Sequence, residues 1–283
     1  MDCKSYKIKY YLVILSAVFW LSIVQANYCM GLTNDFRTEK SAYEEFPLWG
    51  ISASLDFKSG DYGAQTTTRT IYMPFELSRY FSKGELSFTI PYIEQESEGQ
   101  VKVIGGKPFR SKADRQTQTK TTESGLGDII LKGEYDLWAD QADLFFASVS
   151  GAVKLPTADE DNGLGTGEYD FTFGVNNKRL LSEKWKIYAG FYYTFIGEPS
   201  NEKMDNELAF DLGVSCHVLK EVEARFFYEQ STAIIPGDAD PKSVVLGISY
   251  ELEKNIKLFG DLSLGLSEGS TDIGVSLGIN AGF

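Results

Sequence analysis

The sequence predicts an all-β fold, namely a transmembrane antiparallel up-and-down β-barrel of about 12 strands with both termini in the periplasm. Three observations predict it. From Trp49 to Phe283 apolar and polar residues alternate, which is a strand signal when it is sustained over such lengths. The connections between the alternating segments are long and short in turn. Aromatic residues collect near both ends of the apolar faces, as expected at two membrane interfaces.

Composition limits the classes of protein to which the chain can belong. Its 283 residues include 27 Lys and Arg against 40 Asp and Glu, which gives a formal net charge of −13. This balance argues against nucleic acid as a partner, because phosphate binding needs a basic face. One histidine and three cysteines exclude most His/Cys metal sites. Outside the N-terminus no segment is apolar over the ~20 residues of a membrane helix.

The N-terminal residues 1–26 have the features of a secretory signal peptide. Three lysines precede an apolar run over 10–24, and Ala26 ends a small-residue cleavage site. The apolar run is short for the alternative, a membrane anchor. Cleavage leaves a short periplasmic N-terminal segment, 27–48, and a barrel domain, 49–283. The expected location is the outer membrane of a Gram-negative bacterium.

The predicted strands have apolar faces that contain no charged residue, while the opposite faces carry 14 acidic and 6 basic residues. A soluble β-sandwich would also alternate, with its apolar face in the core. The loops and the aromatic residues therefore have to separate the two interpretations. The alternating segments are 49–57, 71–77, 86–92, 129–137, 145–155, 169–175, 185–195, 208–218, 222–228, 244–252, 256–266 and 273–283.

The lengths of the connections favour the barrel. Outer-membrane barrels have short periplasmic turns and longer outside loops, whereas a Greek-key sandwich has no reason to alternate in this way. The short gap at 267–270 falls in the long series and is a mild exception. The other long gaps are 58–69, 94–125, 156–168, 197–205 and 231–241, and the short gaps are 79–83, 138–142, 178–184, 219–221 and 253–255.

The outward aromatic residues form two predicted girdles around an aliphatic band. Phe283 ends the chain on the lipid-facing phase, and this ending resembles the signal that the barrel-assembly machinery recognises. Pro74 and Pro91 fit the pattern least well, because proline removes a ladder donor, and they mark bulges or strand ends. The girdle residues are Trp49, Tyr135, Phe145, Trp185, Tyr250 and Phe283 at the periplasmic rim, and Phe57, Tyr92, Tyr169, Tyr193, Phe195 and Tyr228 at the outer rim.

Two stretches resemble segments of the phenol-degradation MetA-pathway family of outer-membrane β-barrel proteins. The first is SGLGDIILK, which ends at Lys132, and the second is KLPT from Lys154 with LGTG at 164–167 and Asp170. Ala158 stands where the family has glycine. The resemblance implies an outer-membrane barrel that serves as a transport channel near catabolic pathways. It implies no catalytic residues and leaves the substrate open.

The inward-facing charges are the candidate lumen residues. An excess of acids predicts a hydrated lumen that favours cations, while the alternative is that many of them only solvate the rims. We expect Arg225 to pair with Glu223 or Glu229, and Lys132 with Glu134 or Asp128. The lumen candidates are Asp56, Glu76, Glu85, Asp128, Lys132, Glu134, Asp170, Lys186, Asp211, Glu223, Arg225, Glu229 and Asp261.

Three further features have competing interpretations. The long mixed-charge loop 94–124 either folds inward and gates the pore or lies on the surface. Asp159 and Asp161 are weak calcium candidates, because their spacing does not match an EF-hand loop. Ser215 and His217 form the closest Ser/His pair, but they face inward near a short turn, which does not favour catalysis.

The sequence therefore predicts a non-enzymatic channel for passive uptake of small solutes, with aromatic and cationic solutes as candidate classes. The expected partners are the outer-membrane lipid bilayer, the assembly machinery and a small-molecule solute, with no cofactor and no nucleic acid. One alternative is a non-conducting structural or adhesive barrel that acts through its surface loops. The others are an outer-membrane enzyme and a soluble secreted β-protein.

Overall fold

The computed structural model describes residues 47–63, 66–97, 101–110, 120–139 and 145–283. The predicted signal peptide, 1–26, and almost all of the predicted segment 27–48 lie outside these described residues. Within the described part of the chain, no helix is long and apolar enough to cross a membrane.

The described residues form fifteen strands. They are β1 (Trp49–Gly60), β2 (Thr68–Phe81), β3 (Gly84–Ser97), β4 (Val101–Ile104), β5 (Lys107–Arg110), β6 (Thr121–Leu126), β7 (Ile129–Ala139), β8 (Phe145–Leu155), β9 (Asp170–Leu180), β10 (Trp185–Phe195), β11 (Glu207–Leu219), β12 (Val222–Ser231), β13 (Lys242–Glu253), β14 (Ile256–Gly265) and β15 (Ile273–Gly282).

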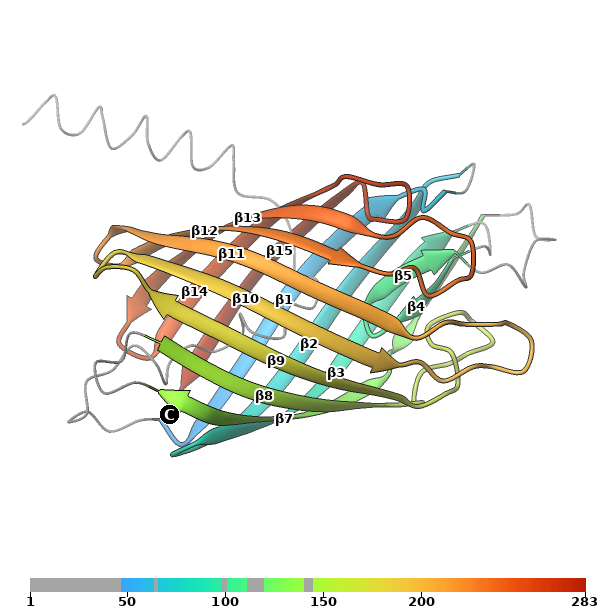
Figure 1. Ribbon diagram of the computed structural model, residues 1–283. Helices are drawn as coiled ribbons and strands as arrows, with labels where there is room; N and C mark the ends of the chain where they lie inside the picture. Colours follow the sequence, from blue (N-terminus) through green and yellow to red (C-terminus); the bar gives the residue numbers. More distant parts are fainter. Residues whose placement is uncertain (1–46, 64–65, 98–100, 111–119, 140–144) are drawn as a thin grey trace, which may run out of the picture.

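Twelve strand positions close into an antiparallel barrel, which confirms the predicted fold (Figure 1). Along the wall, each strand pairs with the strands before and after it. β1 pairs with β2 on one side and with β15 on the other, in a register that places Gly50 opposite Gly282. Trp49 and Phe283 exchange two backbone hydrogen bonds of 2.9 Å. The seam is thus closed by backbone pairing, as lipid requires.

One position in the wall is occupied by two consecutive strands, which the sequence did not predict. β7 pairs with the first half of β3, and β6 pairs with its second half. Gly127, between β6 and β7, donates a backbone hydrogen bond of 2.9 Å to the Pro91 carbonyl. The fourth wall strand therefore begins at Thr121, inside the predicted loop 94–125, and not near Ile129.

Pro74 and Pro91 lie opposite each other in β2 and β3, and both strands continue past them. They do not end their strands. Instead, the pairing of β1 with β2 is interrupted beside Pro74, and beside Pro91 the partner of β3 changes from β7 to β6. Since proline has no N–H to donate, each proline occupies a place where the ladder to its other neighbour is already broken.

Short and long connections lie at opposite ends of the barrel, as predicted (Figure 1). Both Trp49 and Phe283 lie at the short-turn rim, whose assignment to the periplasm stays a prediction. We call the opposite end the long-loop rim. The short-turn rim includes the turns 82–83, 181–184, 220–221 and 254–255, and the long-loop rim includes 61–67, 156–169, 196–206, 232–241 and 266–272.

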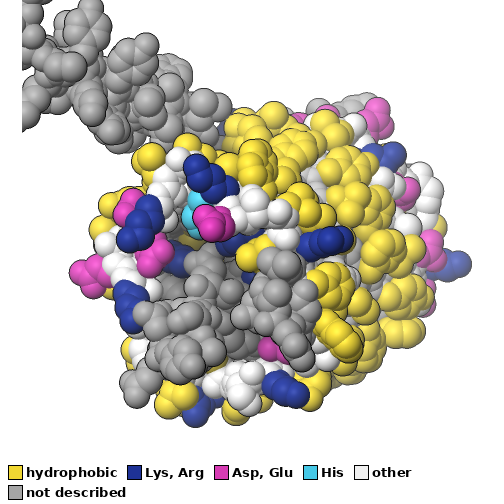
Figure 2. All heavy atoms as spheres, turned by 60° about the vertical axis from the view of Figure 1, so that its left-hand side comes forward, with side chains coloured by type: hydrophobic (Ala, Val, Ile, Leu, Met, Phe, Trp, Pro, Cys, Tyr) yellow, Lys and Arg dark blue, Asp and Glu magenta, His cyan; other side chains and the backbone are white. Residues whose placement is uncertain are grey.

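The barrel wall is apolar outside and largely polar inside. Figure 2 shows hydrophobic side chains over much of the flank, with charged side chains mostly toward the ends. The opposite phase of the same strands is buried and polar, as at Asp56, Ser215 and Ser276. This arrangement suits a wall that contacts lipid. The exposed apolar side chains include Ile51, Leu55, Phe75, Leu131, Phe173, Phe191, Leu212, Leu246 and Leu277.

Candidate functional site: the lumen and its vestibule

All thirteen candidate lumen residues lie on the side of the wall opposite the exposed apolar belt, or in the β6–β7 junction. Six are less than a tenth exposed, namely Asp56, Asp128, Asp170, Lys186, Asp211 and Asp261. Seven are partly buried, namely Glu76, Glu85, Lys132, Glu134, Glu223, Arg225 and Glu229.

Two details of the inward charges differ from the prediction. Lys178 was assigned to a turn, but β9 extends to Leu180, so Lys178 is buried on the inner face with its ammonium 4.7 Å from the Phe146 ring centroid. Asp272 is one of the 14 acidic residues counted on the inward faces from the sequence, but it precedes β15 and is exposed. In both cases the strand boundary was misplaced by a few residues.

Carboxylates form a cluster on the inner wall near the short-turn rim. Glu85 of β3 lies directly opposite Glu134 of β7, and like charges in this position repel. Lys132 lies 3.3 Å from Glu134, which confirms one of the expected pairings. Glu76 accepts hydrogen bonds from two hydroxyl groups of β2 and β3. Three glutamates, two hydroxyl groups and one lysine thus meet on this part of the inner wall.

Arg225 forms an ion pair that sequence reasoning missed. Its Nη2 lies 2.7 Å from Asp261 Oδ1, two strands away. Gly247 of β13 lies between them in register, facing both. A Cβ at Gly247 would lie 2.2 Å from Asp261 Oδ1 and 2.9 Å from Arg225 Nε. The missing side chain therefore leaves the space through which the two charges meet.

Replacing Gly247 with Ala is expected to lower the free energy of unfolding by about 1–3 kcal/mol, because it overpacks this contact. Urea-induced unfolding in phospholipid vesicles measures the change. Gly151→Ala is the matched control, since its Cβ would meet only the Thr172 carbonyl at 4.0 Å. Equal stability of the two variants would contradict this account of Gly247.

Four segments that carry the family resemblance meet in one buried cluster. Lys154 Nζ lies 3.2 Å from Asp128 Oδ2 and 2.8 Å from Asp170 Oδ2, and it donates to Thr166 Oγ1 at 3.0 Å. The other oxygen of Asp128 accepts backbone N–H bonds from Thr157 at 3.1 Å and from the next residue at 3.0 Å. The cluster ties the β6–β7 junction, the end of β8 and the loop 156–169 together. Sequence reasoning did not bring these residues together.

The hairpin β4–β5 lies inside the barrel at the long-loop rim (Figure 1). Its turn is Gly105-Gly106, where both residues have positive φ, as a two-residue hairpin turn requires. Val103 is fully buried and packs with Tyr72, Ile93 and Leu164. Of the two interpretations of loop 94–124, the structure supports inward folding for residues 101–110, while residues 94–97 and 121–124 belong to the wall strands β3 and β6.

Polar contacts also hold the hairpin to the wall. Lys58, which is 1% exposed, donates from Nζ to the Gly106 carbonyl at 2.7 Å. On the other side, Lys107 Nζ lies 3.0 Å from Glu207 Oε1 and 3.3 Å from its Oε2. These contacts hold the turn of the hairpin and the start of β5 between β1 and β11. The Lys107–Glu207 contact was not anticipated from the sequence.

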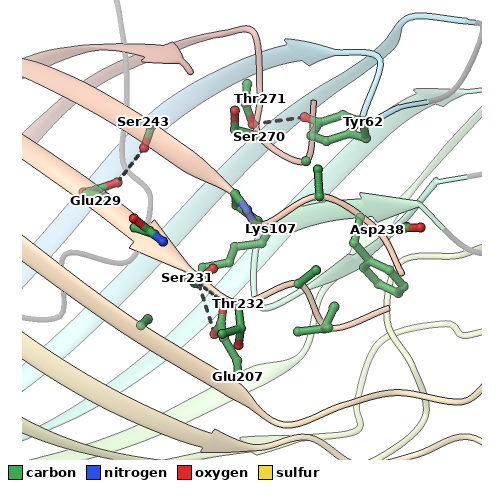
Figure 3. A pocket seen from close by; sticks show the side chains of 18 of the residues that line it. Tyr62, Lys107, Glu207, Glu229, Ser231, Thr232, Asp238, Ser243, Ser270 and Thr271 are labelled. Atoms are coloured by element: carbon green, nitrogen blue, oxygen red, sulfur yellow. Dashed lines mark hydrogen bonds and ion pairs between the residues drawn. The ribbon is translucent and has the colours of Figure 1, made fainter. Parts of the chain in front are cut away.

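Two cavities flank this hairpin. The larger, about 280 Å³, lies between the hairpin and the inner faces of β11–β14, and we call it the vestibule cavity (Figure 3). The smaller, about 70 Å³, lies beside β8–β10. Lys107, Tyr192 and Glu207 contribute to the lining of both. The Lys107–Glu207 ion pair is therefore part of the partition between two interior spaces.

Tyr62 forms part of the roof of the vestibule cavity. Its backbone has φ of 50°, which is rare for a residue with a side chain. The ring is 4% exposed, and its hydroxyl hydrogen-bonds Thr271 Oγ1 at 3.1 Å (Figure 3). Burial raises the pKa of Tyr62 above that of a free tyrosine, so the hydroxyl stays protonated. The contact joins the β1–β2 loop to the β14–β15 loop.

Asp159 and Ser215, from the calcium and Ser/His candidates, have local structural partners. Asp159 Oδ1 accepts backbone N–H bonds from Asp161 and Asn162, which caps a turn in the exposed loop. Among the described residues, no group of three or more His, Cys, Asp or Glu side chains is arranged to hold a metal. Ser215 is buried and donates a hydrogen bond to Glu223, with the Tyr188 hydroxyl beside it.

Comparison with known proteins agrees with this architecture. The model of the family described as "Putative MetA-pathway of phenol degradation" matches residues 49–283. No curated protein matches the chain in sequence.

Three solved structures share the fold. The COG4313 outer membrane channel from Pseudomonas putida F1 superposes with a TM-score of 0.66 at 14% identity, covering 87% of this chain and 99% of that one. The KdgM porin has a TM-score of 0.54 at 8% identity, covering 83% and 99%. The NanC porin has a TM-score of 0.51 at 10% identity, covering 82% and 98%. At these identities the likeness establishes an outer-membrane barrel fold.

Proposed function

Because the chain belongs to the MetA-pathway family of phenol degradation, we propose that it is an outer-membrane channel for passive uptake of small solutes through a polar, acidic lumen. The observation that carries this proposal is the partition of the wall. Its outer face is an apolar belt suited to lipid, and its inner face is lined by charged and hydroxyl side chains. Charged and hydroxyl side chains in the interior can solvate water and ions. They do not help to hold the barrel in the lipid bilayer.

The acids of the inner wall are the basis for the proposed selectivity. Glu76, Glu85 and Glu134 lie together near the short-turn rim, with Lys132 as a cationic neighbour. Asp211 and Glu229 lie near the long-loop rim. Acids at both ends of the lumen attract cations and repel anions, as rings of carboxylates do in other pores. We also propose that transport is non-enzymatic and needs no cofactor.

Single-channel recording in planar lipid bilayers tests the proposal. With a salt gradient across the bilayer, we expect discrete current steps and a reversal potential on the cation-selective side. Glu76→Gln combined with Glu85→Gln is expected to shift the reversal potential toward zero, because two fixed negative charges leave the lumen. Anion selectivity of the wild-type protein would overturn the acidic-lumen proposal.

The same recording separates the channel from a structural or adhesive barrel. A protein that is folded, as judged by circular dichroism and by its migration on unheated gels, but passes no current would sink the channel proposal. It would favour a barrel that acts through the long-loop rim. The inward hairpin gives this alternative a structural basis, because it narrows the interior of the barrel at the long-loop rim.

A further inference from the structure

The vestibule cavity combines an acidic wall with an apolar wall. Asp211 and Glu229 line the β11–β12 side, and Phe109 and Ile235 line the side of the hairpin and the β12–β13 loop. Ile235 and Phe109 belong to one packed apolar cluster, so this wall is fixed in place. A pocket that is mainly apolar with a few convergent polar groups, at the mouth of a barrel, is the usual form of a small-molecule site.

The acidic wall carries two carboxylates on neighbouring strands, with Asp211 leaning toward Gly190 of β10 and Glu229 toward Ser243 of β13. Asp211 of β11 and Glu229 of β12 are direct partners in the strand register. Two acids on one face of neighbouring strands make the local potential negative, which favours a cation in the cavity between them and the hairpin. Glu229 accepts a hydrogen bond of 3.2 Å from the Ser243 hydroxyl, which orients its carboxylate (Figure 3).

Asp211 is the acidic residue of the cavity whose buried charge most needs a compensating partner. It is 8% exposed, and it lies beside the Tyr192 hydroxyl, which donates its proton to Asn176 Oδ1 at 2.6 Å. Among the described residues, no Lys or Arg lies within ion-pair distance of it. A buried carboxylate without a cationic partner is costly, because a charge removed from water needs a compensating charge. It lines a cavity that is large enough to hold one.

The protein already places one ammonium group at the edge of this cavity. Lys107 of the hairpin reaches Glu207 through its Nζ, with its aliphatic stem along the cavity wall. The lining contains five acidic residues, Glu207, Asp211, Glu229, Asp238 and Glu268, and one lysine, Lys107. The wall therefore has chemistry suited to a second ammonium group.

We propose that the vestibule cavity binds a small organic ammonium ion, with its cationic group at Asp211 and Glu229 and its apolar body against Phe109 and Ile235. The inference rests on the proposed channel function and names the class of solute that the lumen would select. The cavity of about 280 Å³ is close to twice the ~150 Å³ cavity that holds benzene in an engineered protein. A single aromatic ring with a short aminoalkyl chain matches that size.

Other ligand chemistries fit less well. A bare metal ion would leave the apolar wall without a partner, and the described residues contain no cluster of three metal-ligating side chains. An anion would meet the carboxylates of Asp211 and Glu229. A neutral aromatic compound would fill the apolar side but would leave the charge of Asp211 uncompensated.

Isothermal titration calorimetry on the full-length protein in detergent micelles tests the site directly. The probes are 2-phenylethylammonium chloride and its neutral analogue 2-phenylethanol. We expect the ammonium compound to bind about tenfold more tightly or better, which is the scale of one charge-assisted hydrogen bond. Equal affinity of the two probes, or no binding of the ammonium compound, would overturn the proposal.

Variants separate the site from general surface charge. Asp211→Asn is expected to weaken 2-phenylethylammonium by roughly tenfold while leaving 2-phenylethanol unchanged. Asp205→Asn is the matched control, because Asp205 is an exposed acid at the same rim that does not line the cavity. If both variants lose affinity equally, the binding is nonspecific attraction and the site is wrong.

The proposed binding site and the proposed channel function can each be rejected without rejecting the other. Calorimetric binding by a protein that passes no current would keep the ammonium site and reject the channel. Cation-selective current without ammonium binding would keep the channel and reject the site. If the site and the channel are both real, 2-phenylethylammonium should reduce the sodium current of the wild-type protein and should reduce it less in Asp211→Asn.

Discussion

Replacing Lys154 with Met is expected to lower the free energy of unfolding of the barrel by about 3–5 kcal/mol, because it leaves two buried carboxylates without their shared cation. Asp128 is 2% exposed and Asp170 is 4% exposed, and both lie within 3.2 Å of the Lys154 ammonium. Met keeps most of the aliphatic volume of Lys154, so the loss of stability measures the effect of removing the positive charge. Urea-induced unfolding in phospholipid vesicles measures it.

Two further variants decide whether the charge cluster is the cause. Lys184→Met changes an exposed lysine in a short turn and is expected to shift stability by less than about 0.5 kcal/mol. The triple variant Lys154→Met, Asp128→Asn, Asp170→Asn removes all three charges together and should recover much of the loss. A Lys154→Met variant as stable as Lys184→Met would contradict a stabilising role of the cluster.

This cluster gives a physical reason for the family resemblance. The matching segments are far apart in the sequence but supply Asp128, Lys154, Thr166 and Asp170 to one ion-pair and hydrogen-bond set. Gly165 lies against it, since a Cβ there would be 2.9 Å from Asp128 Oδ2 and 2.7 Å from the Ala158 Cβ. The segments therefore fix how a loop closes onto the wall at the long-loop rim.

The barrel wall could be predicted because the direction of each side chain in a strand is set by its position in the local sequence. A residue in a strand faces lipid or lumen according to its parity, so alternation from Trp49 onward was enough to assign the two faces. The pairing of Lys132 with Glu134 followed from the same parity. The Arg225–Asp261 pair did not follow, because it spans two strands and depends on the small size of Gly247.

The interior of the mouth was not predictable from alternation. The hairpin signal was present as VKVI-GG-KPFR at 101–110, since Gly-Gly between two short strand-like runs favours a two-residue turn. Its position inside the barrel depends on contacts between distant segments, such as Val103 with Leu164 and Lys107 with Glu207. The alternation of apolar and polar residues carries no information about these contacts.

Replacing the hairpin 101–110 with a Gly/Ser linker of equal length is expected to raise the single-channel conductance on the order of twofold or more, because the constriction of a pore limits its current. The hairpin strands pair with each other and not with the wall strands, so the barrel should still close. The linker removes the packing of Val103 and the contacts of Gly106 and Lys107 together. Recording in planar bilayers under symmetric salt measures the change.

A single substitution tests whether the Lys107–Glu207 contact holds the hairpin in the lumen. Lys107→Met removes an ion pair of 3.0 Å and should increase conductance or the time spent in higher-conductance levels. Lys120→Met is its matched control, because Lys120 pairs with Glu96 at 2.7 Å outside both cavities. Unchanged conductance of the folded linker variant would contradict the prediction and would mean that the current is limited elsewhere in the lumen. An effect of the linker without any effect of Lys107→Met would assign the retention of the hairpin to Lys58 and the apolar contacts of Val103.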